Sequence, residues 1–420
     1  MRKLLVILPV IFLGVPQFIS AEGYYDVYLR GWEQAERGDF AKAIADYDKS
    51  LALNTNFSSV YCDRAEAKAK LGDFDGAIVD YRKYLAAKPH DSYGYDGLGM
   101  ALHKKGDLDA ALTNYDKAIE LKPEYAEAHC HRGWLLSDKG EFAKALIELD
   151  TAVKLAPKDA VMLYNRGNVK NSKGDVQGAM ADYTEAIKIN PNDPLGYSNR
   201  ALAKINAGDL DGAVDDYDKL IQITPDDRVA YLDRGLAKRD KGDLIGAAKD
   251  FTKAVELKPA DPEVYSFRAY VLFNLGQLTN AMTDFRKTLE FGSKEQDYPN
   301  FRLWLIQTKL GHQEIADTEL NAYWANRKSG KQGDWSSRVA HFLTGGLDEQ
   351  SFFRFAGDAD KKKENEQLCE AWFYGAEKRL MAGDEKVSLD YFEKCIGTKQ
   401  KDFEEYQSAI FEIKRIKGGK

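Results

Sequence analysis

Residues 172–191 read SKGDVQGAMADYTEAIKINP, and close copies of this stretch recur along the 420-residue chain. The glycine at its third position returns every 34 residues, as Gly38, Gly72, Gly106, Gly140, Gly174, Gly208 and Gly242. A fixed period of this length is typical of a protein built from stacked structural repeats. It predicts eight consecutive units, at 24–57, 58–91, 92–125, 126–159, 160–193, 194–227, 228–261 and 262–295.

Each unit has the features of two antiparallel helices. Gly174 and Asp175 together are typical of one helix ending and the next beginning with a capping carboxylate. Small residues such as Gly167 and Ala179 let the two helices approach closely, while Tyr183 fills the space beside them. Because one pair cannot bury its own apolar face, the core is complete only when successive pairs stack.

These features resemble tetratricopeptide repeats over residues 24–295, and residues 369–402 return to the same pattern with Trp372, Ala376 and Phe392. The resemblance implies an all-α, right-handed superhelical solenoid with a divergent helical C-terminal region. Residues 1–21 would be a signal peptide, 296–368 the divergent segment and 403–420 a capping helix and tail. The first helices would line a concave face that binds peptides or partner proteins, and most such proteins are adaptors rather than enzymes.

Arginine occupies the seventh position of seven units, and an acidic residue occupies the twenty-third position of the same seven. Both exceptions, Leu98 and Asn114, fall in one unit. This joint loss predicts that each arginine pairs with the carboxylate of its own unit, as Arg166 with Asp182, since a planar guanidinium matches a carboxylate. An anion-binding stripe is the alternative, and it would need arginines without partners.

The variable residues of the first helices share one face, because steps of three and four residues stay aligned on a helix. Aromatic rings and amides on such a face suit an extended peptide, since rings supply contact area and amides satisfy backbone groups. Packing between units is the alternative for individual rings. The predicted peptide-binding residues are Tyr28, Trp32, Tyr93, Met100, His131, Trp134, Tyr164, Asn168, Asn199, Arg239 and Tyr270.

Some tetratricopeptide grooves hold a terminal carboxylate with lysines and asparagines. Asn168 and Asn199 match the two asparagine sites, but Tyr164, Val229 and Asp233 stand where that clamp has basic residues. The resemblance therefore argues against a carboxylate clamp of this kind.

Two of the four cysteines are placed where they could pair. Cys369 and Cys395 would lie at the same open end of the late helix pair, and a disulfide is feasible if their β-carbons come within ~3.5–4.5 Å. Two separate buried thiols are the alternative. Cys62 and Cys130 lie two full units apart, which is too far to bridge when helices stack ~8–10 Å apart.

The first 21 residues, MRKLLVILPVIFLGVPQFISA, combine basic residues, an apolar run and small residues. This is the pattern of a secretory signal peptide cut after Ala21, and an uncleaved anchor is the alternative. Cleavage predicts a periplasmic or secreted protein with no membrane span in the mature chain. The formal net charge of −7 makes nucleic acid a poor partner, because nucleic acid favours basic surfaces.

The sequence shows no motif for catalysis. It has no phosphate-binding glycine loop, no nucleophile elbow and no metal-spaced histidine pair. Side chains of successive helical residues point ~100° apart, so His129, Cys130 and His131 cannot converge on one metal ion. We expect a protein-binding scaffold or adaptor with no enzymatic activity, no cofactor and no metal.

Two alternatives remain: a structural or assembly subunit of a cell-envelope complex, and an enzyme with an unrecognised site in the C-terminal third. The C-terminal part loosely resembles envelope tetratricopeptide lipoproteins that dock periplasmic proteases and murein hydrolases. That resemblance would fit an envelope adaptor.

Overall fold

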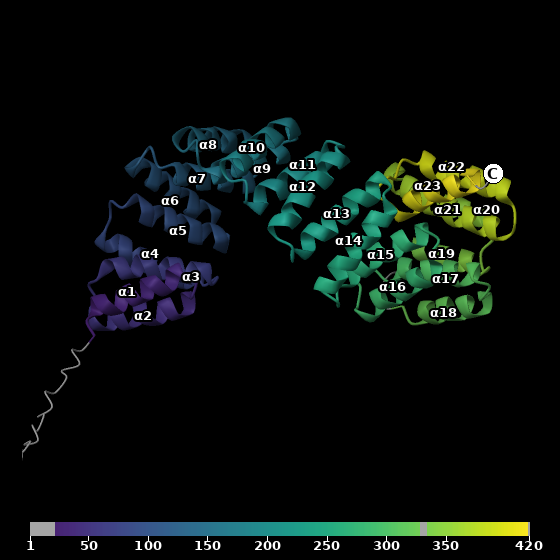
Figure 1. Cartoon of the computed structure of the whole chain (residues 1–420), viewed down its shortest axis with the longest axis horizontal. Coiled ribbons are helices and arrows are strands. Elements are labelled where there is room, and N and C mark those ends of the chain that lie inside the picture. The colour runs from purple at the N-terminus through teal and green to yellow at the C-terminus, as the bar shows by residue number, and fades with distance from the viewer. Residues whose placement is uncertain (1–21, 328–333, 419–420) are drawn as a thin grey trace, which may run out of the picture. The chain divides into compact units, whose positions relative to one another are not determined.

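The structure, a computed structural model, describes residues 22–327 and 334–418. The predicted signal peptide lies outside the described residues. In these residues every assigned element of secondary structure is an α-helix, and the helices are numbered α1 to α23 (Figure 1). None of them combines the length and the apolar character that crossing a bilayer requires. The chain divides into two compact parts, an N-terminal unit that ends at Ile189 and a C-terminal unit that begins at Asn190.

The N-terminal unit consists of five helix pairs, and the first helix of each pair begins at the first residue of a predicted repeat. Neighbouring pairs pack on one another in chain order. The helices are α1 (Tyr24–Glu36), α2 (Phe40–Leu53), α3 (Ser58–Lys70), α4 (Phe74–Ala87), α5 (Ser92–Lys105), α6 (Leu108–Leu121), α7 (Ala126–Asp138), α8 (Phe142–Leu155), α9 (Ala160–Ser172) and α10 (Val176–Ile189).

The C-terminal unit starts with three more pairs of the same kind and continues with less regular helices. The pairs are α11 (Pro194–Asn206), α12 (Leu210–Ile223), α13 (Arg228–Lys241), α14 (Leu244–Leu257), α15 (Pro262–Asn274) and α16 (Leu278–Glu290). They are followed by α17 (Asp297–Lys309), α18 (Gln313–Ala325), α19 (Trp335–Leu343), α20 (Glu349–Phe355), α21 (Lys361–Met381), α22 (Glu385–Gly397) and α23 (Glu404–Gly418). The late repeat-like pair is α21 and α22, and α21 begins eight residues before Cys369.

The repeat residues do in the structure what the sequence pattern predicts. Gly174 has a φ of 90°, a left-handed conformation that favours glycine, and the Asp175 carboxylate accepts a hydrogen bond from the Gly178 amide. A β-carbon at Gly167 would lie 2.6 Å from the ring of Tyr183. The two helices of a pair are therefore as close as their smallest residues allow.

The predicted arginine–carboxylate pairs are confirmed, and they extend further than predicted. In six units the guanidinium donates two hydrogen bonds of 2.6–2.9 Å to the aspartate of its own second helix. Arg132 pairs with Glu148 at 2.7 Å. Several arginines also bond to the second helix of the preceding repeat, as Arg166 does to Asp150 at 2.9 Å. Each such arginine thus joins helices within a repeat and between repeats.

The last helix, α23, lies inside the C-terminal unit rather than only at its end. It packs against α15, α21 and α22 (Figure 1). Ser408 and Ala409 on α23 are fully buried, and Phe411 packs on the core of the α13–α15 region. The sequence predicted a capping helix here, but this helix covers first helices of the preceding repeats as well.

Candidate functional site

Two neighbouring pockets open on the first helices of the N-terminal unit. The smaller, here called the Trp32 pocket, has a volume of about 110 Å³. The larger, here called the Tyr93 pocket, has a volume of about 480 Å³. Glu66 on α3 lines both of them. Five residues of the predicted set are in or beside these pockets: Tyr28, Trp32, Tyr93, Met100 and His131.

The Trp32 pocket combines aromatic rings with carboxylates. Its lining residues come from α1, α2 and α3 and are Trp32, Ala35, Glu36, Phe40, Tyr47, Asp63, Glu66 and Ala67. Tyr28 donates a 2.8 Å hydrogen bond to Asp63, so this predicted residue positions a carboxylate of the pocket. Burial raises the pKa of Asp63 above its usual range, which the Tyr28 hydrogen bond opposes.

The Tyr93 pocket lies between α3, α4, α5 and α7 and is held by tyrosine–carboxylate hydrogen bonds. The Tyr93 hydroxyl donates to Glu66 at 2.9 Å, and His131 Nδ1 lies 2.9 Å from Asp96 Oδ1. The Tyr81 ring reaches the pocket over Gly97, where a β-carbon would lie 2.6 Å from the Tyr81 hydroxyl. Gly97 therefore makes the space in which that ring end sits.

The carboxylates of the Trp32 pocket are not among the residues predicted from the sequence. Glu66 occupies the ninth position of its repeat, the same position as the predicted Trp32, Met100, Trp134 and Asn168 in theirs, so the spacing alone could have indicated it. Asp63 occupies the repeat position of His131 and Asn199, so the predicted set could also have indicated it. Glu36 lies outside the predicted positions and reaches the pocket through the packing of α1 against α3.

Trp134 lies outside both pockets. The Lys104 ammonium sits 4.0 Å from the centre of its ring, and the His103 ring lies 4.9 Å away. Such a cation over an indole is attractive, so part of this ring is already engaged within the chain.

The neighbouring His129, Cys130 and His131 face different partners. His129 lies between Glu148 at 2.8 Å and the Pro123 carbonyl at 2.9 Å, whereas His131 contacts Asp96. Burial raises the pKa of Cys130 to about 12, which disfavours the thiolate that metals bind. Within the described residues no group of three metal-binding side chains comes together.

Three further predicted residues, Tyr164, Asn168 and Asn199, line neither pocket. Tyr164 on α9 is buried, which agrees with the alternative of packing between repeats. Asn168 is exposed and accepts a 2.7 Å hydrogen bond from the Tyr183 hydroxyl. Asn199 lies on α11, in the C-terminal unit, and is partly buried.

In the C-terminal unit, α23 occupies the face on which a peptide was predicted to bind. Arg239 on α13 forms a 2.7 Å ion pair with Glu404, and its guanidinium is therefore taken by the chain itself. Tyr270 on α15 is buried, with the Arg302 guanidinium 5.1 Å from its ring centre. Arg239 and Tyr270 therefore lie beneath α23. The helix can pack there because its acidic residues Glu404 and Glu405 form ion pairs with Arg239 and Arg302.

Beneath α23, buried acidic and basic side chains form a network of ion pairs. Arg302 is fully buried and lies 3.1 Å from Glu405, whose carboxylate also accepts from the Tyr374 hydroxyl. Lys309 lies 2.7 Å from Glu377 and 3.3 Å from Glu412. No local sequence pattern indicates these ion pairs, since most of them join residues more than a hundred positions apart.

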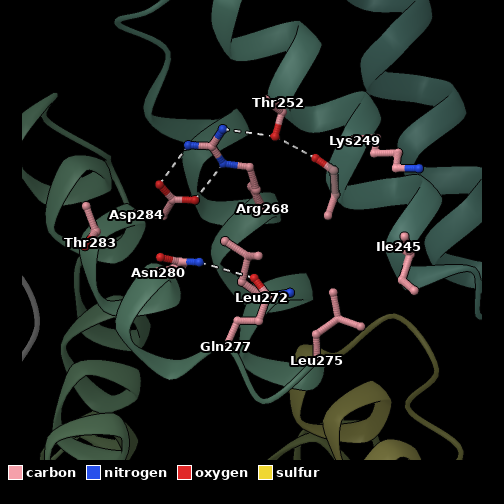
Figure 2. A pocket seen from close by; sticks show the side chains of 11 residues that line it. Ile245, Lys249, Thr252, Arg268, Leu272, Leu275, Gln277, Asn280, Thr283 and Asp284 are labelled. Atoms are coloured by element: carbon pink, nitrogen blue, oxygen red, sulfur yellow. Dashed lines mark hydrogen bonds and ion pairs between the residues drawn. The ribbon is translucent and has the colours of Figure 1, made fainter.

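A wider depression of about 640 Å³ lies between α14, α15 and α16 of the C-terminal unit (Figure 2). Most of its polar side chains are paired with one another. Arg268 binds Asp284 through two hydrogen bonds and Thr252 through a third, and Asn280 donates to Gln277 (Figure 2). We therefore place the candidate site in the two pockets of the N-terminal unit.

Cys369 and Cys395 are both fully buried, and their Sγ atoms lie 3.5 Å apart as two thiols. The predicted disulfide stays a prediction, since the sulfurs are in contact but not bonded here. Burial raises the pKa of Cys395 well above its usual value.

Comparison with known proteins extends the sequence argument. Models described as "TPR repeat" match residues 99–137 and 167–208, and models described as "Tetratricopeptide repeat" match 28–92, 126–159, 196–227 and 232–296. Together these matches span more than half of the chain. A search among curated proteins found no match.

Among solved structures, the crystal structure of MamA is 30% identical, covers 39% of this chain and 95% of its own, and has a TM-score of 0.36. A tetratricopeptide repeat protein from Parabacteroides merdae is 17% identical and covers 59% of this chain and 98% of its own, with a TM-score of 0.46. A thermophilic TPR protein from Thermus thermophilus is 23% identical, covers 44% of this chain and 100% of its own, and has a TM-score of 0.40.

Tetratricopeptide repeats generally form scaffolds for protein interaction and are not catalytic. The period, the helix pairs and the family matches agree over the same residues, and the chain therefore belongs to the tetratricopeptide repeat family.

Proposed function

We propose that the chain is an exported scaffold that binds an extended segment of a partner protein on the first helices of its N-terminal unit. The observation that carries this proposal is the pair of adjacent pockets with exposed rings. Trp32 is 48% exposed and Tyr93 is 45% exposed, although both are large aromatic residues beside a cavity. Rings placed in this way serve as anchors in protein recognition, because they supply large contact areas with few rotatable bonds.

The polar groups of the pockets support binding rather than catalysis. Asp63 and Glu66 accept hydrogen bonds from tyrosines, and Asp96 contacts His131 and Tyr125. These bonds orient the carboxylates within the wall of the face. A partner segment would add contacts to groups that are already fixed in place, which lowers the entropy lost on binding.

Export is proposed from residues 1–21, whose basic start, apolar run and small final residues form a signal peptide. Mass spectrometry of the protein purified from the periplasm or the culture medium should give a chain that begins at Glu22. A chain that retains residues 1–21 and stays with membranes would contradict cleavage.

The binding proposal is tested by site-specific crosslinking in living cells. A photoreactive phenylalanine analogue at Tyr93 should trap a defined partner segment, which mass spectrometry of the crosslinked peptide identifies. The same analogue at Ile147 is the matched control, because Ile147 is 64% exposed on the second helix α8. Equal crosslinking from both positions would contradict a binding face on the first helices.

A further inference from the structure

We propose that the Trp32 pocket binds a basic side chain, a lysine or arginine, of the partner segment. This inference rests on the proposed function, because it names the chemistry of the segment bound on the same face. It is carried by the composition of the pocket wall, by an unpaired hydroxyl in that wall and by the size of the cavity.

The pocket wall carries three rings and three carboxylates. The rings are those of Trp32, Phe40 and Tyr47, and the carboxylates belong to Glu36, Asp63 and Glu66. Among the residues that the structure describes, no lysine or arginine lines the pocket. A cation is attracted both by the faces of aromatic rings and by nearby carboxylates, and partial removal from water strengthens both attractions.

Tyr47 supplies a polar group that has no partner within the described chain. Its side chain is 1% exposed and lines the pocket, and among the described residues its hydroxyl has no hydrogen-bond partner. A hydroxyl that has no partner in the chain keeps its hydrogen-bonding capacity available for a ligand in the pocket. The hydroxyl oxygen can accept from an ammonium or guanidinium N–H, as the carboxylates do.

The size of the cavity fits the end of such a side chain. A volume of about 110 Å³ equals the space of roughly four liquid waters, enough for an ammonium group and the methylenes next to it. The Tyr93 pocket next to it suits the flanking residues rather than a second cation, because Lys70 and Lys104 line it together with Glu66, Asp96 and Glu127.

The same wall disfavours a ligand that presents a carboxylate. Glu36, Asp63 and Glu66 would repel it, and the described lining residues include no basic group that would compensate. The carboxylates of the pocket therefore attract a basic side chain and also discriminate against an acidic one.

The test uses small probes and the folded, mature chain. Nα-acetyl-lysine-methylamide is titrated into protein with ¹⁵N-labelled tryptophan, and the indole signal of Trp32 is followed by NMR. That signal is identified by its absence in Trp32→Phe. We expect a saturable shift of the Trp32 signal, with binding at least about threefold weaker for the isosteric, uncharged norleucine derivative.

Two conservative variants test the carboxylates. Glu66→Gln and Asp63→Asn keep an oxygen that accepts from Tyr93 and Tyr28, so the fold should survive while a charge is lost. Each should weaken binding of the lysine derivative about threefold or more. Glu120→Gln is the matched control, because Glu120 is exposed on the second helix α6 and carries the same charge, and it should leave binding unchanged.

Three outcomes would overturn the inference: no saturable shift with the lysine derivative, equal binding of the norleucine derivative, or equal binding by Glu66→Gln and the parent. If crosslinking from Tyr93 still traps a partner segment, the proposed function stands and only the basic side chain is wrong. If crosslinking also fails, the proposed function fails with it.

Discussion

In several repeats, one arginine joins three helices. Arg166 holds Asp182 in its own second helix and Asp150 in the preceding one, and Lys170 also contacts Asp182. The Asp182 side chain is buried, so its charge depends on these partners rather than on water. Breaking a buried pair from one side leaves a charge without compensation, which costs more than the intact pair contributes.

The repeat at 92–125 lacks both the arginine and the carboxylate, so neither charge is left without a partner there. Leu98 replaces the arginine there, and Asn114 donates to the Ala110 carbonyl at 2.7 Å. We therefore expect Arg166→Leu to lower the free energy of unfolding by about 3 kcal/mol. Adding Asp182→Asn should recover part of the loss, because the buried carboxylate, which would keep only Lys170 as a partner, is gone. Urea unfolding of both single variants and the double variant measures the coupling, and strictly additive losses would show that the two residues are independent.

The same pairs make stability depend on acidity. Burial alone raises the pKa of Asp80, but hydrogen bonds from Arg64 and Lys68 and their charges lower it more, and the result lies below the usual range. An aspartate with a lowered pKa stabilises the folded state above its unfolded value of about 3.9, and this contribution is lost as the pH falls through the folded value.

The expected result is a stability difference between the parent and Asp80→Asn that is large at pH 7 and shrinks as the pH falls below about 4. Unfolding free energies measured in urea at a series of pH values check it. A difference that stays constant down to acid pH would mean that the Asp80 charge adds nothing.

At the scale of helices, the 34-residue period accounts for the positions of α1 to α16 but not for which faces stay open. Periodicity fixes the direction in which a side chain leaves its helix, whereas its exposure depends on what the neighbouring helix covers. Tyr93 and Tyr164 belong to the same predicted face, yet Tyr93 is exposed and Tyr164 is buried. Arg239 is covered by Glu404, 165 residues later, and no local pattern carries that contact.

The helix α23 should be held in place chiefly by its buried charges. Glu405→Ala would leave Arg302, which has no exposed surface, without its carboxylate. We expect a loss of about 3–5 kcal/mol in the free energy of unfolding of the C-terminal unit. Glu393→Ala is the matched control on α22, since Glu393 pairs with Lys417 at the surface, and it should change stability by less than about 1 kcal/mol. Equal small losses in a tryptophan-fluorescence unfolding curve would contradict a structural role for the Arg302 pair.

At the scale of the whole molecule, the first helices of the repeats have different surroundings in the two units. In the N-terminal unit, two pockets with exposed rings open on the first helices. In the C-terminal unit, α23 fills the corresponding face with acidic side chains on Arg239, Arg302 and Lys309. The face of the C-terminal unit is therefore occupied by a helix of the same chain, whereas the face of the N-terminal unit is where a partner is proposed to bind.

The oxidation state of Cys369 and Cys395 connects the structure with the proposed export. Their sulfur atoms lie 3.5 Å apart, so a disulfide needs only a small adjustment of the two side chains. In an oxidising compartment we expect the bond to form and to stabilise the C-terminal unit by about 3–4 kcal/mol on a loop-entropy estimate. In a reducing cytoplasm the two thiols should persist.

Burial of Cys369 and Cys395 also determines how fast the disulfide can form. Both cysteines are inaccessible, and burial raises the pKa of the Cys395 thiol, so the reactive thiolate is scarce in the folded chain. Protein folded under reducing conditions should therefore oxidise slowly, whereas protein isolated from the secretory fraction should already be two mass units lighter. Mass spectrometry after alkylation in denaturant measures both samples, with Cys369→Ala as the control that cannot form the bond. Alkylation of all four cysteines in the secreted protein would show that the pair stays reduced and that the C-terminal unit is stable without a disulfide.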